Sequence, residues 1–152
     1  MKTASISTLD AHVGYWLRTV SNHVSHAFRL KVEALGVTVA EWVVLRQLLE
    51  MGEAHPSDVA ERLGMTRGAI SKLVERLVVK EYVVRSATGN DRRYQSVKMT
   101  GSGRKLVPAL AALADRNDEE FFGFLRRDEV ANLTKMLKAI VHHHGLKSAP
   151  VD

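Results

Sequence analysis

Apolar residues recur at steps of three and four positions along much of the chain, which is the spacing that places them on one face of an α-helix. The first such segment begins after Ser7 and Asp10, which have the spacing of a capping box, and ends at Gly36. A second segment begins after Thr38 and ends at Gly52. The pattern therefore predicts two helices in the first third of the chain.

Two shorter helices are predicted next, separated by a turn of only a few residues. The first starts at Pro56, which suits the first position of a helix, and stops at Gly64. Thr66 can cap the second, whose apolar side chains fall within an arc of about 100°. Two short helices joined by so tight a turn are typical of a helix-turn-helix. The apolar residues of the second helix are Ile70, Leu73, Val74 and Leu77.

After Lys80 the pattern changes from helical to extended. Residues 82–84 and 94–99 have the β-branched and aromatic side chains that strands favour, and residues 88–91 between them favour a turn. The sequence therefore predicts a β-hairpin with a polar, basic tip directly behind the helix-turn-helix.

Two further helices are predicted in the last third of the chain. Thr100 can cap the first, and Asp128 with Glu129 carries the negative charge that suits the start of the second. Taken in order, the elements predict a mainly α fold with a small β-wing. This fold combines a winged helix-turn-helix with an outer helical region.

Composition narrows the classes of function. The 152 residues are 45% hydrophobic, which excludes wholesale disorder. The sequence has no run of about 18 apolar residues, the length that a membrane-spanning helix needs. No apolar secretion signal opens the sequence, so we expect a cytoplasmic protein. The absence of cysteine excludes thiol catalysis and thiolate metal sites, and no nucleotide-binding or hydrolase motif is present. We therefore expect neither an enzyme nor a cofactor or metal.

Positive charge is concentrated in one stretch. Residues 66–98 hold eight of the 22 basic residues and three of the 17 acidic ones, which leaves 14 of each sign in the rest of the chain. Such a concentration is typical of a surface that faces nucleic-acid phosphates. The eight basic residues are Arg67, Lys72, Arg76, Lys80, Arg85, Arg92, Arg93 and Lys98.

The second short helix has the side chains that a major-groove helix needs. Small residues at its start let the backbone approach the duplex, and Ser71 and Lys72 can reach base edges. Arg76 and Lys80 are expected at phosphates, and cationic side chains at the hairpin tip suit a narrow minor groove. The predicted DNA contacts are Ser57, Thr66, Arg67, Gly68, Ala69, Ser71, Lys72, Arg76, Asp91, Arg92 and Arg93.

The run of residues 56–74 resembles the MarR family of bacterial regulators, and so do the Asn-Asp-Arg-Arg stretch at 90–93 and residues 97–104. The resemblance covers nearly the whole chain. It implies that Arg93 enters the minor groove while Asp91 helps to hold it. One departure is Glu81, where the family commonly has glycine before the first wing strand. Glycine adopts positive φ without strain and glutamate does not, so the entry to the wing is expected to differ.

The resemblance also implies a homodimer in which residues 1–36 and 101–146 form a helical dimerisation region around the DNA-binding lobe of residues 37–100, as one intertwined domain. The apolar stripes of these outer helices support a dimer independently, because the lobe is too small to cover them. A two-fold dimer would select an inverted-repeat operator. We expect a repressor that a small-molecule effector, an aromatic or phenolic acid, releases from DNA.

Candidates for the effector site are Trp16, His23, Trp42 and Arg46, although helical spacing explains both tryptophans as core residues and a salt bridge explains Arg46. His23 with His26 could also bind a metal, which leaves a histidine-based metal-responsive regulator as an alternative. A second alternative is a winged helix that binds protein or RNA. Salt-sensitive binding to duplex DNA would separate the cases.

Overall fold

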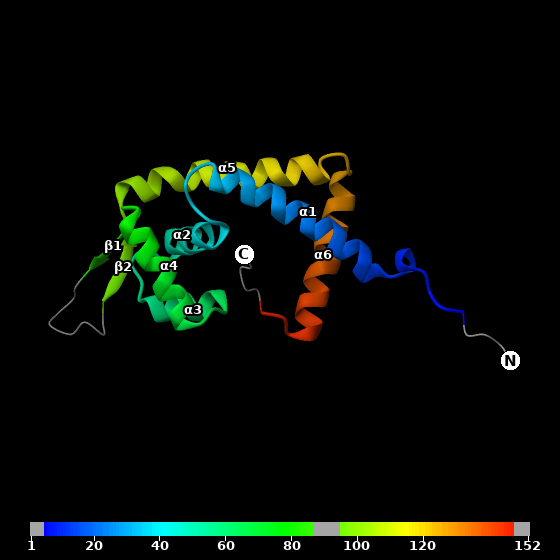
Figure 1. The fold of residues 1–152 in the computed structure, drawn as a ribbon, viewed down its shortest axis with the longest axis horizontal. Helices are drawn as coiled ribbons and strands as arrows, with labels where there is room; N and C mark the ends of the chain where they lie inside the picture. The colour runs from blue at the N-terminus through cyan, green and yellow to red at the C-terminus, as the bar shows by residue number, and fades with distance from the viewer. Residues whose placement is uncertain (1–4, 87–94, 148–152) are drawn as a thin grey trace.

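The computed structural model describes residues 5–86 and 95–147. Figure 1 shows α2, α3, α4 and the hairpin gathered at one end, α5 running from them to the other end, and α6 turning back there. None of the helices in the described ranges is long and apolar enough to cross a membrane. The elements are η1 (Leu9–Ala11), α1 (Val13–Glu33), α2 (Val39–Met51), α3 (Pro56–Leu63), α4 (Arg67–Val79), β1 (Val83–Ser86), β2 (Ser96–Met99), α5 (Gly101–Phe122) and α6 (Arg127–His144).

The hydrophobic core lies inside the lobe of residues 37–100 and continues into the two helices that flank it. Leu45, Leu48 and Leu77 are fully buried there, and burial of each such side chain stabilises the fold by about 1.5–3 kcal/mol. Val32 of α1 and Leu110 of α5 are buried in the same core. The lobe is therefore fixed to the end of α1 and to the first half of α5.

The predicted starts and stops of the central helices are confirmed. The hydroxyls of Thr38, Thr66 and Thr100 each accept a hydrogen bond of 3.1 Å from the backbone N–H three residues further on. Pro56 occupies the first turn of α3, and Gly64 ends that helix in the left-handed conformation with φ of 66°. These caps satisfy backbone groups that a helix end leaves without partners.

The predicted capping box at Ser7 and Asp10 is wrong. The chain there forms the short 3-10 turn η1, and α1 starts after His12, whose backbone is extended. The indole N–H of Trp16 donates to the carbonyl oxygen of Asp10 at 2.8 Å, which fixes this turn against the first turn of α1. The helix also ends three residues before Gly36, the predicted stop.

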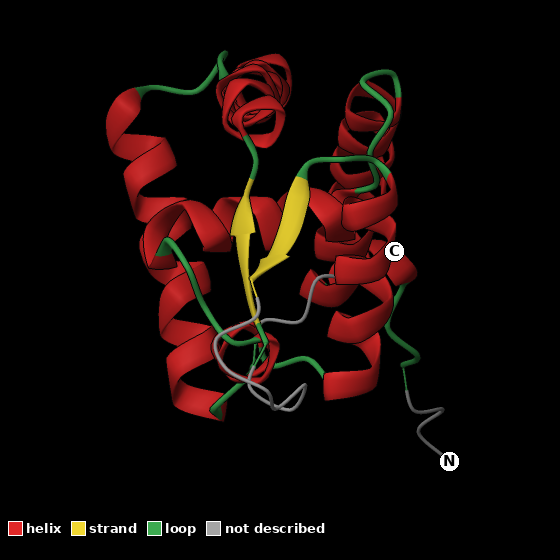
Figure 2. Ribbon diagram, turned by 90° about the vertical axis from the view of Figure 1, so that its left-hand side faces the viewer, coloured by secondary structure: helices red, strands yellow, loops and turns green. Residues whose placement is uncertain are grey.

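The hairpin is confirmed, with shorter strands than predicted. β1 and β2 pair antiparallel, with Val83 opposite Met99 and Ser86 opposite Ser96 (Figure 2). A third segment, which the sequence analysis missed, joins them at Ala54, which exchanges two backbone hydrogen bonds of 2.8 and 3.0 Å with the opposing residue of β2. The loop between α2 and α3 is therefore tied to the hairpin.

An ion pair joins α2 to the end of α4. The Lys80 ammonium donates to the Glu41 carboxylate at 2.7 Å and to the carbonyl oxygen of Gly36 at 2.9 Å. Glu41 is only 1% exposed, and the ammonium group replaces the water that its carboxylate loses on burial. The contact fixes the C-terminal end of α4 to the segment that leaves α1.

The start of α5 packs closely against the entry to β1. A Cβ atom at Gly103 would collide with the backbone carbonyl of Tyr82, which also accepts a hydrogen bond of 3.0 Å from the N–H of Thr100. Only glycine allows this approach, because it has no side chain.

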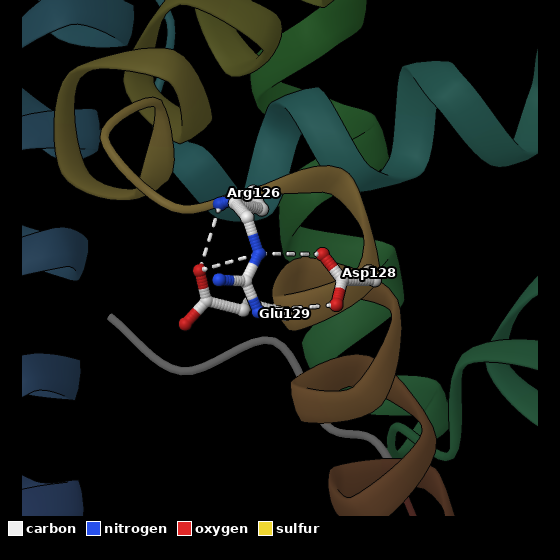
Figure 3. Close-up of polar contacts among 3 residues, drawn as sticks. All are labelled: Arg126, Asp128 and Glu129. Atoms are coloured by element: carbon white, nitrogen blue, oxygen red, sulfur yellow. Dashed lines mark hydrogen bonds and ion pairs between the residues drawn. The ribbon is translucent and has the colours of Figure 1, made fainter.

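The start of α6 is held by three charged side chains, as Figure 3 shows. The backbone N–H of Arg126 donates to the Glu129 carboxylate at 3.1 Å, and its guanidinium donates to both oxygens of Asp128 at 3.1 and 3.3 Å. The guanidinium keeps the pKa of the Asp128 carboxyl below its ordinary value. The prediction of a negatively charged start to the last helix is confirmed.

The entry to the wing is strained. Glu81 has a φ of 64°, and no other non-glycine residue of the described ranges has a positive φ. The Thr100 hydroxyl binds its carbonyl oxygen at 2.6 Å and stabilises this conformation from the far side of the hairpin. The sequence departs from the family's glycine at this position, and the left-handed backbone is kept despite the glutamate.

We expect Glu81→Gly to increase the free energy of unfolding by about 1 kcal/mol. The left-handed conformation costs an L-residue about 1–2 kcal/mol, and the greater freedom of glycine in the unfolded chain offsets part of the gain. Urea denaturation at one fixed protein concentration measures the difference. The control is Glu81→Gln, which retains Cβ and should gain nothing. A Gly variant no more stable than the Gln variant would contradict the strain.

Candidate nucleic-acid interface

The helix-turn-helix is formed by α3, a tight turn and α4. Gly64 ends α3, and the N–H of Met65 donates back to the carbonyl oxygen of Ala60 at 2.9 Å, which reverses the chain within three residues. Thr66 then caps α4. Local sequence thus sets the angle between the two helices, and the buried face of α4 holds it.

The predicted contact residues of α4 lie on its solvent side. Ile70, Leu73, Val74 and Leu77 are buried, whereas the opposite face is open. Ala69 is half-buried beside that face. The exposed candidates are Ser57, Thr66, Arg67, Gly68, Ser71, Lys72 and Arg76.

A polar recess of about 320 Å³ brings three elements of this face together. Ser57 at the start of α3, Arg67 and Ser71 on α4, and Arg85 on β1 all line it. Ser57 and Arg85, which are 28 positions apart in the sequence, therefore share one surface. The structure brings the predicted contact residue of α3 into the same site as those of α4.

Two of the described basic residues of the stretch are paired with carboxylates. Lys80 binds the buried Glu41 carboxylate at 2.7 Å, which competes with the phosphate contact expected for it, and that contact stays a prediction. Arg85 forms an ion pair of 2.8 Å with Glu75. Arg67, Lys72 and Arg76 form no ion pair within the described ranges, and they supply the positive charge of this face.

Three predicted contacts of the hairpin, Asp91, Arg92 and Arg93, lie outside the described residues. The strands that lead to these residues are described, and Glu53 contacts one of the two strands. Its carboxylate accepts a hydrogen bond from the Ser96 hydroxyl of β2. No sequence pattern marks Glu53 for this role, because its partners come from distant strands.

Hydrogen bonds lower the pKa of the Glu53 carboxyl below its ordinary value of 4.5. The largest contribution comes from Ser96, followed by Ser86, and the charges of Lys98 and His55 add to it. A carboxylate is thus kept ionised beside a surface that carries positive charge.

The candidate effector residues do not form one site in the chain. Trp16 is 53% exposed on the first turn of α1, whereas Trp42 is 8% exposed in the core of the lobe. Arg46 pairs with Glu50 at 3.1 Å, in agreement with the salt-bridge interpretation, and His23 is exposed on α1. The pocket beside Trp42 and Arg46 measures only about 140 Å³.

A larger hollow of about 440 Å³ lies between α1 and the start of α2. His26 and Arg29 line it, with their ring and guanidinium nitrogens 3.4 Å apart, and Phe28 adds an aromatic side chain. From the sequence, His26 is a candidate only for a metal ligand. No group of three or more potential ligands among the described histidines, aspartates and glutamates is placed to bind a metal.

Comparisons with known proteins agree with this architecture. The sequence model of the MarR family matches residues 35–93. The chain is 30% identical to the multiple antibiotic resistance protein MarR of Escherichia coli over 108 residues, which is 70% of this chain and 75% of that protein.

Two solved structures are similar over most of the chain. A mutant of E. coli MarR in complex with operator DNA has a TM-score of 0.74 and 26% identity, and the alignment covers 85% of this chain and 93% of that one. CouR from Rhodococcus jostii bound to p-coumaroyl-CoA has the same TM-score and identity, with 89% and 95% covered.

The lowered pKa of Glu53 predicts a pH-dependent stability. A carboxyl whose pKa is lower in the folded chain than the ordinary 4.5 stabilises the fold above that pH, and this contribution is lost as the pH falls through the folded pKa. We expect the stability of the wild type to fall more steeply between about pH 5 and pH 3 than that of Glu53→Gln. Urea midpoints at stepped pH measure this.

The matched control is Glu61→Gln, which removes an exposed carboxylate that has no hydrogen bond in the described part of the chain. Its profile should run parallel to that of the wild type. A parallel profile for Glu53→Gln as well would show that the carboxylate does not support the hairpin.

Proposed function

This chain belongs to the MarR family of transcriptional regulators, and we propose that it is a repressor that binds an inverted-repeat operator as a homodimer. An aromatic or phenolic acid releases it from DNA. The observation that carries the proposal is the open face of α4, where small and basic side chains lie opposite a fully buried face.

The face of α4 matches what a major-groove helix requires. The side chains of Thr66, Gly68 and Ala69 are small, so the backbone N–H groups at the start of α4 can approach a phosphate. Ser71 and Lys72 lie one turn further on, where they can reach base edges. Ser57 contacts the neighbouring phosphates from α3, together with Arg67 and Arg76. Asp91, Arg92 and Arg93 act at the minor groove as the family resemblance implies. The solved E. coli relative in complex with operator DNA supports this assignment.

The outer helices supply the dimer interface. α6 has no buried residue and α1 has only Val32, yet both carry apolar stripes. Water-exposed apolar surface of this extent requires a partner, and a second copy places two recognition helices about one DNA turn, roughly 34 Å, apart. The exposed apolar residues are Val13, Trp16, Leu17 and Val20 on α1 and Met136, Leu137, Ile140 and Val141 on α6.

The effector binds where the outer helices meet the lobe. The hollow between α1 and α2 exceeds about 300 Å³, the lower bound for small-molecule sites, and the Arg29 guanidinium beside it suits a carboxylate. The pocket at Trp42 and Arg46 falls below that bound. CouR, which is 26% identical, was solved with p-coumaroyl-CoA. Trp16 and His23 are not among the residues that line this hollow, and their contact with the effector stays a prediction.

The purified chain should select an inverted repeat from a pool of random duplexes, with an affinity that falls steeply as salt rises. Ile140→Glu places a charge on the apolar face of α6, so we expect it to lose the dimer in light scattering and most of the DNA affinity in fluorescence anisotropy. Ala139→Glu adds the same charge to the other side of the helix and should change neither. A dimeric Ile140→Glu variant, or equal binding to RNA, would contradict the proposal.

Release by an aromatic acid requires that the ligand bind the DNA-incompetent dimer more tightly, since equal affinity for both states shifts nothing. A preference of about 100-fold, roughly 2.7 kcal/mol, would clear an operator. Benzoate, salicylate and hydroxycinnamate are screened by thermal shift and then titrated into the operator complex. Arg29→Ala should weaken the response without changing DNA affinity. Compounds that bind without release would remove the effector class and leave DNA binding intact.

A further inference from the structure

An acidic residue stands within the DNA-facing stripe of α4. Ser71, Lys72 and Glu75 lie three, four and seven positions after Gly68, and all four residues are exposed opposite the buried face. Homeodomain recognition helices contact bases through residues at this same spacing. A carboxylate on such a face repels phosphates, so its presence there needs a reason beyond solvation.

Arg85 holds that carboxylate from the wing. Its guanidinium donates to one oxygen of Glu75 at 2.8 Å, and the two side chains are 38% and 59% exposed. Arg85 comes from β1, where it lies opposite Val97 of β2, so the rigid hairpin fixes the direction of its side chain. The second oxygen of Glu75 has no hydrogen-bond partner within the described ranges.

We propose that Glu75 reads a cytosine in each operator half-site and that Arg85 is the residue that positions it. Cytosine presents only an amino donor in the major groove, whereas guanine and thymine present oxygen acceptors and adenine presents the N7 acceptor beside its amino group, and these acceptors repel a carboxylate. The Arg85 guanidinium offsets the negative charge of Glu75 and so reduces its repulsion from the phosphates. One carboxylate oxygen remains to accept a hydrogen bond from the cytosine amino group. The inference rests on the DNA-binding function proposed above and adds a specificity determinant to it.

The pairing also links the two DNA-reading elements. β1 and α4 are bridged on the exposed side by Glu75 and Arg85, close to the recess that Arg85 shares with Arg67 and Ser71. A wing displaced from its groove would therefore release the carboxylate of Glu75. Base reading by α4 depends on a wing that is in place.

The test is selection of duplexes from a random pool by four full-length proteins: the wild type, Glu75→Ala, Glu75→Gln and Glu50→Ala. The wild type should enrich one C·G pair at symmetric positions of the two half-sites. Replacing that pair should lower its affinity about 5- to 100-fold, but should change that of Glu75→Ala less than 2-fold. Glu75→Gln should shift the preference toward adenine, because an amide pairs with the adenine edge.

Glu50→Ala is the matched control, because Glu50 forms a similar exposed pair with Arg46 on α2, at 3.1 Å. It should enrich the wild-type sequence. Thermal unfolding establishes that each variant is folded. The same motif for the wild type and Glu75→Ala would overturn the inference while the proposed function stands, whereas failure of the wild type to enrich any sequence would overturn both.

The positioning role is tested with Arg85→Ala and Arg85→Lys. Loss of the cation should weaken the preference for cytosine at least 5-fold, and lysine should restore most of it, since it keeps the charge next to Glu75. Equal preference in the wild type and Arg85→Ala would show that Arg85 does not position the carboxylate.

Discussion

The carboxylate of Glu41 is buried inside the lobe, and a buried charge is tolerated only with a partner. Lys80 supplies that partner and also binds the carbonyl oxygen of Gly36, so one ammonium group joins α2, the end of α4 and the segment that leaves α1. Removal of one member of a fully buried pair costs about 3–5 kcal/mol. The Lys80 side chain is 35% exposed, so that figure is an upper limit for this pair. The direction of α4 relative to α1 is set by this requirement.

The two ends of the molecule differ in how completely they bury their apolar side chains. The lobe buries its apolar residues around Leu45 and Ile70 and closes on Leu110 of α5. The far ends of α1 and α6 leave apolar stripes in water. In the proposed dimer a second copy would cover those stripes, and the Lys80 contact joins the segment after α1 to the end of α4. A ligand between α1 and α2 would act on the same link.

The wing is held by contacts that come from several elements. Ala54 pairs with β2 through an isolated bridge, Glu53 binds the hydroxyl of Ser96, and Arg85 reaches across to α4. Glu81 begins the wing in a strained conformation, which these contacts and the hydroxyl of Thr100 maintain. The strained backbone at Glu81 and the ion pair between Arg85 and Glu75 fix how the hairpin lies against α4.

Local chemistry was enough to determine the helix-turn-helix from the sequence. Threonine caps, Pro56 and Gly64 act within three or four residues, and the period of Ile70 and Leu73 marks a buried face, so these features needed no tertiary information. The start of α1 was predicted wrongly, because the indole of Trp16 binds the carbonyl of Asp10. Charge counting placed Lys80 at the phosphates, yet its partner Glu41 lies 39 positions away in the sequence. Only the folded chain decides which cations are paired, because a buried carboxylate binds one that lies far away in the sequence.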